Sequence, residues 1–153
     1  MKKLYIIFIL LNLIYSVDVF SASNTGSIPN ISNHYLLMPV LYKFENMPIE
    51  KVSDTISRQY IYSPQATLVK WYFKKGAIVP LHHHVNDQIT WITKGSVQVN
   101  SQGKTFIVKA GDVISLPSNV PHEFIALEDT IDIDYFTPAR QDWIDNTATY
   151  LKK

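Results

Sequence analysis

Residues 76–88 read Gly76-Ala-Ile-Val-Pro-Leu-His82-His83-His84-Val-Asn-Asp-Gln88. Side chains alternate between the two faces of a strand, so an extended conformation here puts His82 and His84 on one face and His83 on the other. A hairpin would then bring Gln88 back on the neighbouring strand. The stretch therefore predicts part of a ligand site on one face of a β-sheet.

A further histidine, His122, ends the segment that begins at Gly111. If His122 joins from a third strand, three neutral imidazole nitrogens and the amide oxygen of Gln88 converge on one point. Such donors suit one divalent transition metal ion, and nickel, zinc, manganese and iron all remain open. The alternatives are a surface cluster of histidines and a Gln88 that only hydrogen-bonds within the fold. Ligand number and spacing together favour the metal site.

The pattern from Ile56 onward is typical of an all-β sandwich or barrel. Short runs rich in Ile, Val, Thr and aromatic residues are separated by Gly, Pro, Asn and Asp. The predicted strands are 57–62, 67–73, 79–84, 88–93, 96–100, 105–109, 112–116, 122–126 and 130–136. A helix is expected only from about 139 to 150, where Trp143 and Ile144 would cover an open end of the barrel.

The N-terminus has the features of a secretory signal peptide over residues 1–22. Lys2 and Lys3 precede an apolar run over 4–15, and small residues follow at Ser21 to Ser23. The run is too short for a good membrane span, although an uncleaved anchor is the alternative. We therefore expect an exported protein, periplasmic or secreted, that has no membrane contact after the signal is removed.

The rest of the chain divides into three predicted parts. Residues 23–34 read as a flexible leader, 35–55 as an N-terminal arm or edge strand, and 56–150 as a single β-barrel domain. There is no cysteine, so the exported domain has no disulfide and depends on its packed core.

The charge balance is close to neutral, with 14 basic and 13 acidic residues. Loss of residues 1–22 removes Lys2, Lys3 and Asp18, which leaves 12 of each sign. A neutral surface argues against nucleic acid or an anionic membrane as the main partner. A small-molecule substrate is the expected partner.

These two histidine segments resemble the paired motifs of the cupin superfamily, whose fold is a jelly-roll β-barrel. The first motif is matched at every spacing by Gly76, His82, His84, Gln88 and Gly95, with Gln88 in place of the usual Glu. The second is matched by Gly111, Pro117 and His122, with Asn119 and Ala126 in place of a Gly and an Asn. The resemblance covers about 66–136 and implies that His82, His84 and His122 hold a metal.

A second cluster follows in the last predicted strand. Asp134 and Phe136 share one face of it, with Asp132 two residues earlier, and Arg140 comes just after Thr137-Pro138. A buried acid near a metal can act as a general acid or base, and the planar fork of Arg140 suits a carboxylate. The alternatives are an edge charge for Asp134 and a surface ion pair for Arg140.

Together, the motifs look like the small cupins of the KdgF type, which linearise 4,5-unsaturated monouronates from pectin and alginate breakdown. The resemblance implies metal ligands His82, His84, Gln88 and His122 and catalytic residues Asp134 and Arg140. It also implies that Phe136 contacts the substrate. We further expect Trp91 to stack against the sugar, and the alternative is that Trp91 belongs to the barrel core. Ala139 and Gln141 depart from the Pro and Glu expected there, and the signal peptide departs from the cytoplasmic location expected for this activity.

Two further functions remain open from the sequence. One is a metal-dependent, quercetinase-like dioxygenase, and the other is a non-catalytic periplasmic cupin that binds a small molecule. Neutral ligands leave the full charge on a divalent ion, so an anionic ligand or substrate is expected in each case. A homodimer is also possible, in which Tyr35 to Phe44 is an arm exchanged between two barrels.

Overall fold

The computed structural model describes residues 38–148, and residues 41–148 belong to one compact unit. This part of the chain contains ten strands, a 3-10 turn η2 (Phe44–Asn46) and one short helix, α1 (Gln141–Ile144). The strands are β1 (Glu50–Lys51), β2 (Ile56–Tyr62), β3 (Thr67–Phe73), β4 (Ile78–His82), β5 (Asp87–Lys94), β6 (Ser96–Ser101), β7 (Lys104–Lys109), β8 (Val113–Leu116), β9 (His122–Ala126) and β10 (Thr130–Thr137).

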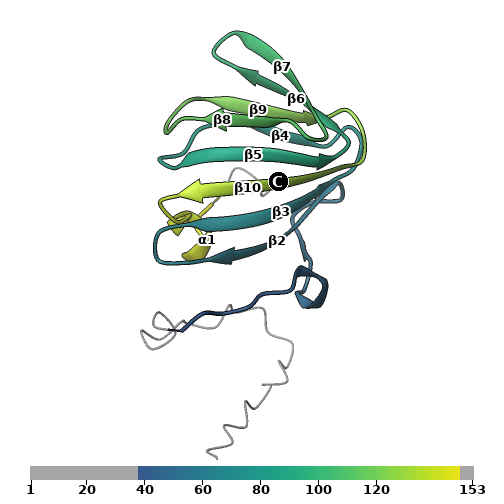
Figure 1. The fold of residues 1–153 in the computed structure, drawn as a ribbon. Helices are drawn as coiled ribbons and strands as arrows, with labels where there is room; N and C mark the ends of the chain where they lie inside the picture. Colours follow the sequence, from purple (N-terminus) through teal and green to yellow (C-terminus); the bar gives the residue numbers. More distant parts are fainter. Residues whose placement is uncertain (1–37, 149–153) are drawn as a thin grey trace, which may run out of the picture. The chain divides into compact units, whose positions relative to one another are not determined.

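The strands form two sheets in which every pair is antiparallel. The larger sheet has the order β1-β2-β3-β10-β5-β8, and the smaller has the order β4-β9-β6-β7 (Figure 1). Every second residue of a strand points inward. On β3, for example, Val69, Trp71 and Phe73 are buried and the residues between them are not. The inner faces of both sheets share one core, which includes Ile92, Val97 and Phe124.

All nine predicted strands are present, and β3 and β9 have the predicted bounds. The all-β fold with a short C-terminal helix is confirmed. The helix is shorter than predicted because Asn146 adopts a left-handed conformation, with φ 56°, just after α1. Residues 149 and 150, also within the predicted helix, lie outside the described residues.

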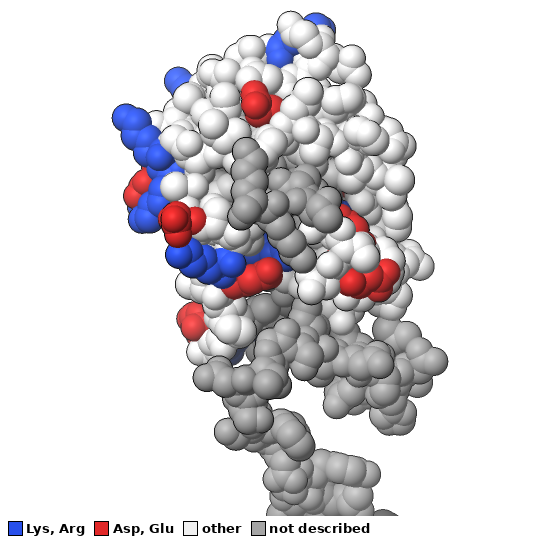
Figure 2. Space-filling view, turned by 180° about the vertical axis from the view of Figure 1, so that it is seen from behind, with Lys and Arg blue, Asp and Glu red and all other residues white. Residues whose placement is uncertain are grey.

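Within the predicted arm, 35–55, the described part contains η2 and β1, and residues 38–43 form no strand. The predicted signal peptide and leader lie outside the described residues. Across 38–148, no helix is long and apolar enough to cross a membrane. On the face seen in Figure 2, basic and acidic side chains lie next to one another rather than in one large area of a single sign.

Candidate metal centre

Three histidines meet where β4 ends and β9 begins. His82 and His122 are paired across these two strands, and His84 follows in the loop after β4. The ring centroids are 4.4 Å apart for His82 and His122, 5.1 Å for His84 and His122, and 5.7 Å for His82 and His84. One nitrogen from each ring lies within 4.8 Å of the other two. The predicted convergence is therefore confirmed, while His83 is exposed.

Each of these rings is oriented by a backbone carbonyl. The Nδ1 atoms of His82, His84 and His122 lie 2.8, 3.0 and 2.8 Å from the carbonyl oxygens of Pro80, Asn86 and Val120. A carbonyl oxygen can only accept, so each Nδ1 carries the hydrogen and each Nε2 keeps its lone pair. Nε2 of His122 is buried and has no hydrogen-bond partner among the described residues. This arrangement is typical of metal-binding histidines, whose second nitrogen donates to a fixed acceptor.

The histidines are held in their neutral form. Burial, reinforced by the neighbouring His122, lowers the pKa of His82 to about 3. Burial and the charge of Arg140 lower the pKa of His84 to about 4. Burial also lowers the pKa of His122. At neutral pH, protons do not compete with a metal for these nitrogens.

Gln88, on β5, turns its amide oxygen toward the histidines. The hydroxyl of Thr90 donates to Asp134 Oδ1, so its oxygen is left to accept the Gln88 Nε2 hydrogen at 2.8 Å. The other end of the amide, Oε1, therefore lies 3.1 Å from His84 Nε2. Both of these atoms are acceptors, and a cation between them and the other two histidines would satisfy both. The donor set thus fits a divalent transition metal ion.

Two buried carboxyl groups, Asp132 and Asp134, lie next to this site on the inner face of β10. Asp134 accepts hydrogen bonds from Thr90 and from Trp71 Nε1, the latter at 3.0 Å. Burial nevertheless raises its pKa to about 6. Burial and the neighbouring charge of Asp134 raise the pKa of Asp132, and its Oδ1 has no hydrogen-bond partner in the described part of the chain. A carboxyl group with a pKa near 6 can both give and take a proton at neutral pH.

Arg140 is also buried, and its guanidinium group is held on several sides. Nε and Nη2 donate to the two carboxylate oxygens of Asp142, at 2.9 and 2.6 Å. The guanidinium carbon lies 4.2 Å from the centroid of the Trp143 ring and 4.9 Å from that of Phe136. The surface ion pair considered as an alternative is therefore excluded, because only 1% of Arg140 is exposed. A substrate carboxylate would share this arginine with Asp142.

A loop contact joins the histidine cluster to the arginine. Asn86, two residues after His84, is buried, and its Nδ2 donates to the carbonyl oxygen of Pro138 at 2.6 Å. The backbone N–H of Arg140 donates to Thr67 Oγ1 at 3.0 Å. The loop that holds His84 and the segment that holds Arg140 are thus fixed to each other and to β3.

The cavity between these groups is small, about 20 Å³. Its polar lining is formed by His82, Gln88, His122, Asp132, Asp134 and Arg140, and its apolar lining includes Trp71, Phe136 and Trp143. About 10–15 Å³ is enough for one water molecule, so the cavity has room for an ion or a water and not for a whole sugar. Of two larger hollows, the one of about 460 Å³ shares only Phe73 with this cavity, and the one of about 560 Å³ shares no lining residue with it.

The structure brings the predicted residues together with one exception, Trp91. Three positions after Gln88, it lies on the opposite face of β5 and does not line the cavity. Half of its surface is exposed, so the core alternative does not hold either. Sequence reasoning also missed Thr90 and Trp71, which bind Asp134. Thr90 could have been found from its parity with Gln88, whereas Trp71 depends on the pairing of β3 with β10.

Known proteins support this description of the fold. The family model described as "Cupin domain" matches residues 69–136. An RmlC-like cupin from Shewanella frigidimarina has a TM-score of 0.65 and 30% sequence identity, over 69% of this chain and 96% of the other. The chain is therefore a cupin.

Two relatives show which family of cupins the chain belongs to. Pectin degradation protein KdgF from Dickeya dadantii is 35% identical over 103 residues, which are 65% of this chain and 94% of that protein. The structure of KdgF from Halomonas sp. has a TM-score of 0.65 and 28% identity, over 68% of this chain and 99% of the other. The chain belongs to the KdgF family of cupins.

Proposed function

We propose that this protein is a metal-dependent cupin enzyme that linearises 4,5-unsaturated monouronates from pectin or alginate breakdown. The observation that carries the proposal is a cluster of three neutral histidines and Gln88 Oε1 next to a buried acid, Asp134, which lines the same cavity as His82, His122 and Gln88. Relatedness to the pectin degradation protein KdgF supports the choice of substrate.

The ligands of the ion would be the Nε2 atoms of His82, His84 and His122 and the Oε1 atom of Gln88. A bound divalent ion would supply Lewis acidity toward the oxygen atoms of the uronate. Because none of these ligands is charged, the site favours an anionic substrate, and the buried Arg140 adds to that preference.

Asp134 would move the proton in this reaction. Opening the ring removes the proton of the anomeric hydroxyl while the bond from C1 to the ring oxygen breaks. The electron pair moves to the ring oxygen, and the resulting enolate takes one proton on carbon, in place of the one removed, to become the keto acid. The reaction is an isomerisation, so one group with a pKa of about 6 can accept the first proton and return one later.

Phe136 and Arg140 would position the sugar. Since the cavity as described has room only for an ion or a water molecule, its lining side chains must move apart for the sugar to reach the buried Asp134 and Arg140. Arg140, fixed by Asp142 and stacked on Phe136, would orient the carboxylate of the substrate.

The test measures linearisation of unsaturated monouronates by NMR, with protein of known metal content. We expect turnover by the metal-loaded protein and a fall in kcat of roughly 10²–10⁴-fold in Asp134→Asn, with metal content unchanged. Glu45→Gln, at an exposed acid outside the cavity lining, is the matched control. The proposal is falsified if the metal-loaded wild-type protein leaves these sugars cyclic at the uncatalysed rate.

Export of the mature chain is part of the proposal. It rests on the two basic residues, the apolar run and the small residues in residues 1–23. N-terminal sequencing of the protein from fractionated cells should give a chain that starts near residue 23 outside the cytoplasm. A chain that starts at Met1 and stays in the cytoplasm would contradict it.

A further inference from the structure

Asn86 contacts both halves of the proposed site. It lies in the loop between β4 and β5, and only 3% of it is exposed. Its backbone carbonyl oxygen lies 3.0 Å from His84 Nδ1 and so orients one of the three histidines. Its side-chain Nδ2 donates to the carbonyl oxygens of Pro138 and Ala139, at 2.6 and 3.3 Å, directly before Arg140 in the chain. Asn86 therefore holds a histidine through its main chain and the arginine segment through its side chain.

The orientation of the Asn86 amide is set by these two contacts. A carbonyl oxygen can only accept, so the atom that faces two of them must be the amide nitrogen, which has two hydrogens to donate. A buried amide that lost both acceptors would be left unpaired, at a cost in stability. The side chain is thus directed at residues 138–140 rather than at solvent.

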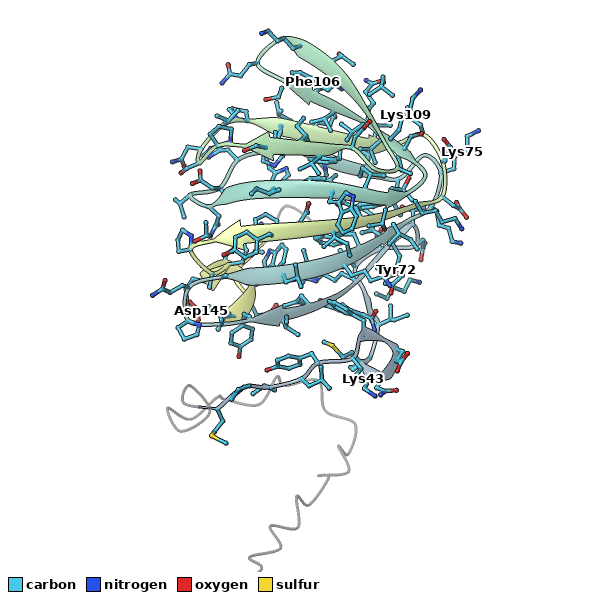
Figure 3. All side chains as sticks on the ribbon, in the orientation of Figure 1. Lys43, Tyr72, Lys75, Phe106, Lys109 and Asp145 are labelled. Carbon is cyan, nitrogen blue, oxygen red and sulfur yellow. The ribbon has the colours of Figure 1, made fainter. Side chains whose placement is uncertain are left out.

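The segment held by Asn86 has no regular structure of its own. Residues 138–140 follow the end of β10 and come before α1, which has four residues and is followed by Asp145, labelled in Figure 3. So short a helix is not stable by itself. The position of this segment therefore depends on its contacts with other elements, which include the Asn86 amide and the bond from the Arg140 N–H to Thr67 Oγ1.

The loop that contains Asn86 is also tied to the segment before His122. The N–H of Asn119 donates to the carbonyl oxygen of His84 at 2.7 Å, and Ser118 Oγ donates to the carbonyl oxygen of Val85 at 2.7 Å. Neither bond involves the Asn86 side chain. A change to that side chain should therefore leave His84 in place and act on the arginine segment alone.

We propose that Asn86 is a positioning residue that transmits metal binding at His84 to Arg140. Once His84 is fixed by an ion, its loop is fixed with it, and the Asn86 amide then fixes the carbonyl groups before Arg140. A substrate would meet the ion and the guanidinium group at one set separation. This suits an anion whose carboxylate and coordinating oxygen have a matching span.

The linkage works in both directions. If ion binding orders the Arg140 segment, an anion that orders this segment tightens ion binding by the same factor. The identity of the anion rests on the function proposed above. The transmission from His84 to Arg140 can be measured without any reaction, so the two proposals can fail separately.

The first experiment measures amide hydrogen exchange by NMR, with and without zinc, which has a filled d shell. The reporter is the N–H of Arg140, which donates to Thr67. In the wild type, zinc at 100 times its dissociation constant should slow exchange roughly 10–100-fold at both Arg140 and Asn119. Asn86→Leu keeps the branched shape of the side chain but has no donor. In this variant, zinc should still slow exchange at Asn119 and should leave Arg140 unchanged.

Ser118→Ala is the matched control, because it removes a different side-chain contact of the same loop. Its Arg140 amide should respond to zinc as in the wild type. The proposal is overturned if zinc does not slow exchange at Arg140 in the wild type, or slows it equally in Asn86→Leu. Should the leucine prevent folding, Asn86→Ala carries the same expectation without adding bulk.

Steady-state kinetics test the consequence for the substrate. Metal-loaded Asn86→Leu should show a KM for the uronate raised roughly 10-fold or more, with metal affinity within about twofold of the wild type by chelator competition. Weaker metal binding with an unchanged KM would show that Asn86 serves only His84 and would overturn the proposal. If the wild type does not convert the uronate but Arg140 responds to zinc only when Asn86 is present, the transmission stands and the proposed function fails.

Discussion

Gln88 Oε1 faces His84 Nε2 at 3.1 Å, and with the imidazole hydrogen on Nδ1, directed at the Asn86 carbonyl, neither atom has a hydrogen to donate. His84 Nδ1 donates to a backbone carbonyl, and Gln88 directs its amide nitrogen at Thr90. Two acceptors in contact repel each other unless a cation lies between them. The contact is thus set in place by hydrogen bonds further from the centre, and the strength of metal binding should depend on those bonds.

Thr90→Val should weaken metal binding by roughly 10–100-fold, because it removes the hydroxyl oxygen that accepts the Gln88 Nε2 hydrogen and so loosens the orientation of the amide. Competition with a chromophoric chelator would measure the affinity. Thr93→Val is the matched control, since Thr93 lies on the exposed side of the same strand. Equal affinity in the wild type and Thr90→Val would show that Gln88 is not a ligand.

Asp134→Asn should make the metal-free protein more stable at neutral pH. The pKa of Asp134 is raised from 3.8 to about 6 on folding, so the folded protein binds more protons than the unfolded chain between these pH values. Protonated Asp134 therefore contributes to the free energy of unfolding. This contribution is fully present below about pH 4 and is lost as the pH rises through 6. The gain of Asp134→Asn over the wild type should therefore grow by about 2 kcal/mol between pH 4 and pH 7. Urea unfolding at several pH values checks this, and a difference that does not change with pH would contradict it.

Arg140→Lys should raise the KM for the uronate by about 10-fold or more, because an ammonium group cannot reproduce the two-point contact with Asp142 or the stacking on Phe136. Arg58→Lys is the matched control. Arg58 packs against the same ring, with its guanidinium carbon 4.4 Å from the centroid of Trp143, but pairs with Glu50 and does not line the cavity. Steady-state kinetics should show a change in KM for Arg140→Lys alone, and similar changes in both variants would argue for a purely structural role.

Gly95→Ala should destabilise the fold much more than Gly103→Ala. Both glycines have a positive φ, 78° and 71°, which costs any other residue about 1–2 kcal/mol. A Cβ at Gly95 would lie 2.6 Å from the carbonyl oxygen of Asp129, whereas a Cβ at Gly103 meets nothing within 4 Å. Thermal unfolding of the two variants measures the difference, and equal melting temperatures would refute this account of the turn.

The fold was predictable because alternation and turn residues act locally. The presence and order of nine strands follow from the period-two pattern, with bounds within two residues of those observed, and His82, Gln88 and His122 follow from motif spacing. Trp91 was misassigned because an aromatic residue near the ligands was expected to meet the sugar, although its odd separation from Gln88 on one strand excludes a shared face. The contact of Trp71 with Asp134 could not be predicted, since it depends on which strands become neighbours and in what register.

The ion pair between Arg140 and Asp142 is a second feature that the sequence could not predict. The two-residue separation from Asp142 is visible in the sequence, but the closure of the carboxylate onto the guanidinium depends on the turn that begins α1. Likewise, the raised pKa values of Asp132 and Asp134 follow from complete burial, which no local pattern specifies.

Strand β10 limits which insertions and deletions this protein can tolerate. It presents Asp132, Asp134 and Phe136 to the cavity and Ile133 and Tyr135 to the outer face of the larger sheet. A one-residue insertion or deletion within it would turn the acids to solvent and the tyrosine toward the histidines. In natural variants of this chain, length changes between Thr130 and Thr137 should therefore be absent or come in pairs of residues, while the turns at either end of the strand can vary freely.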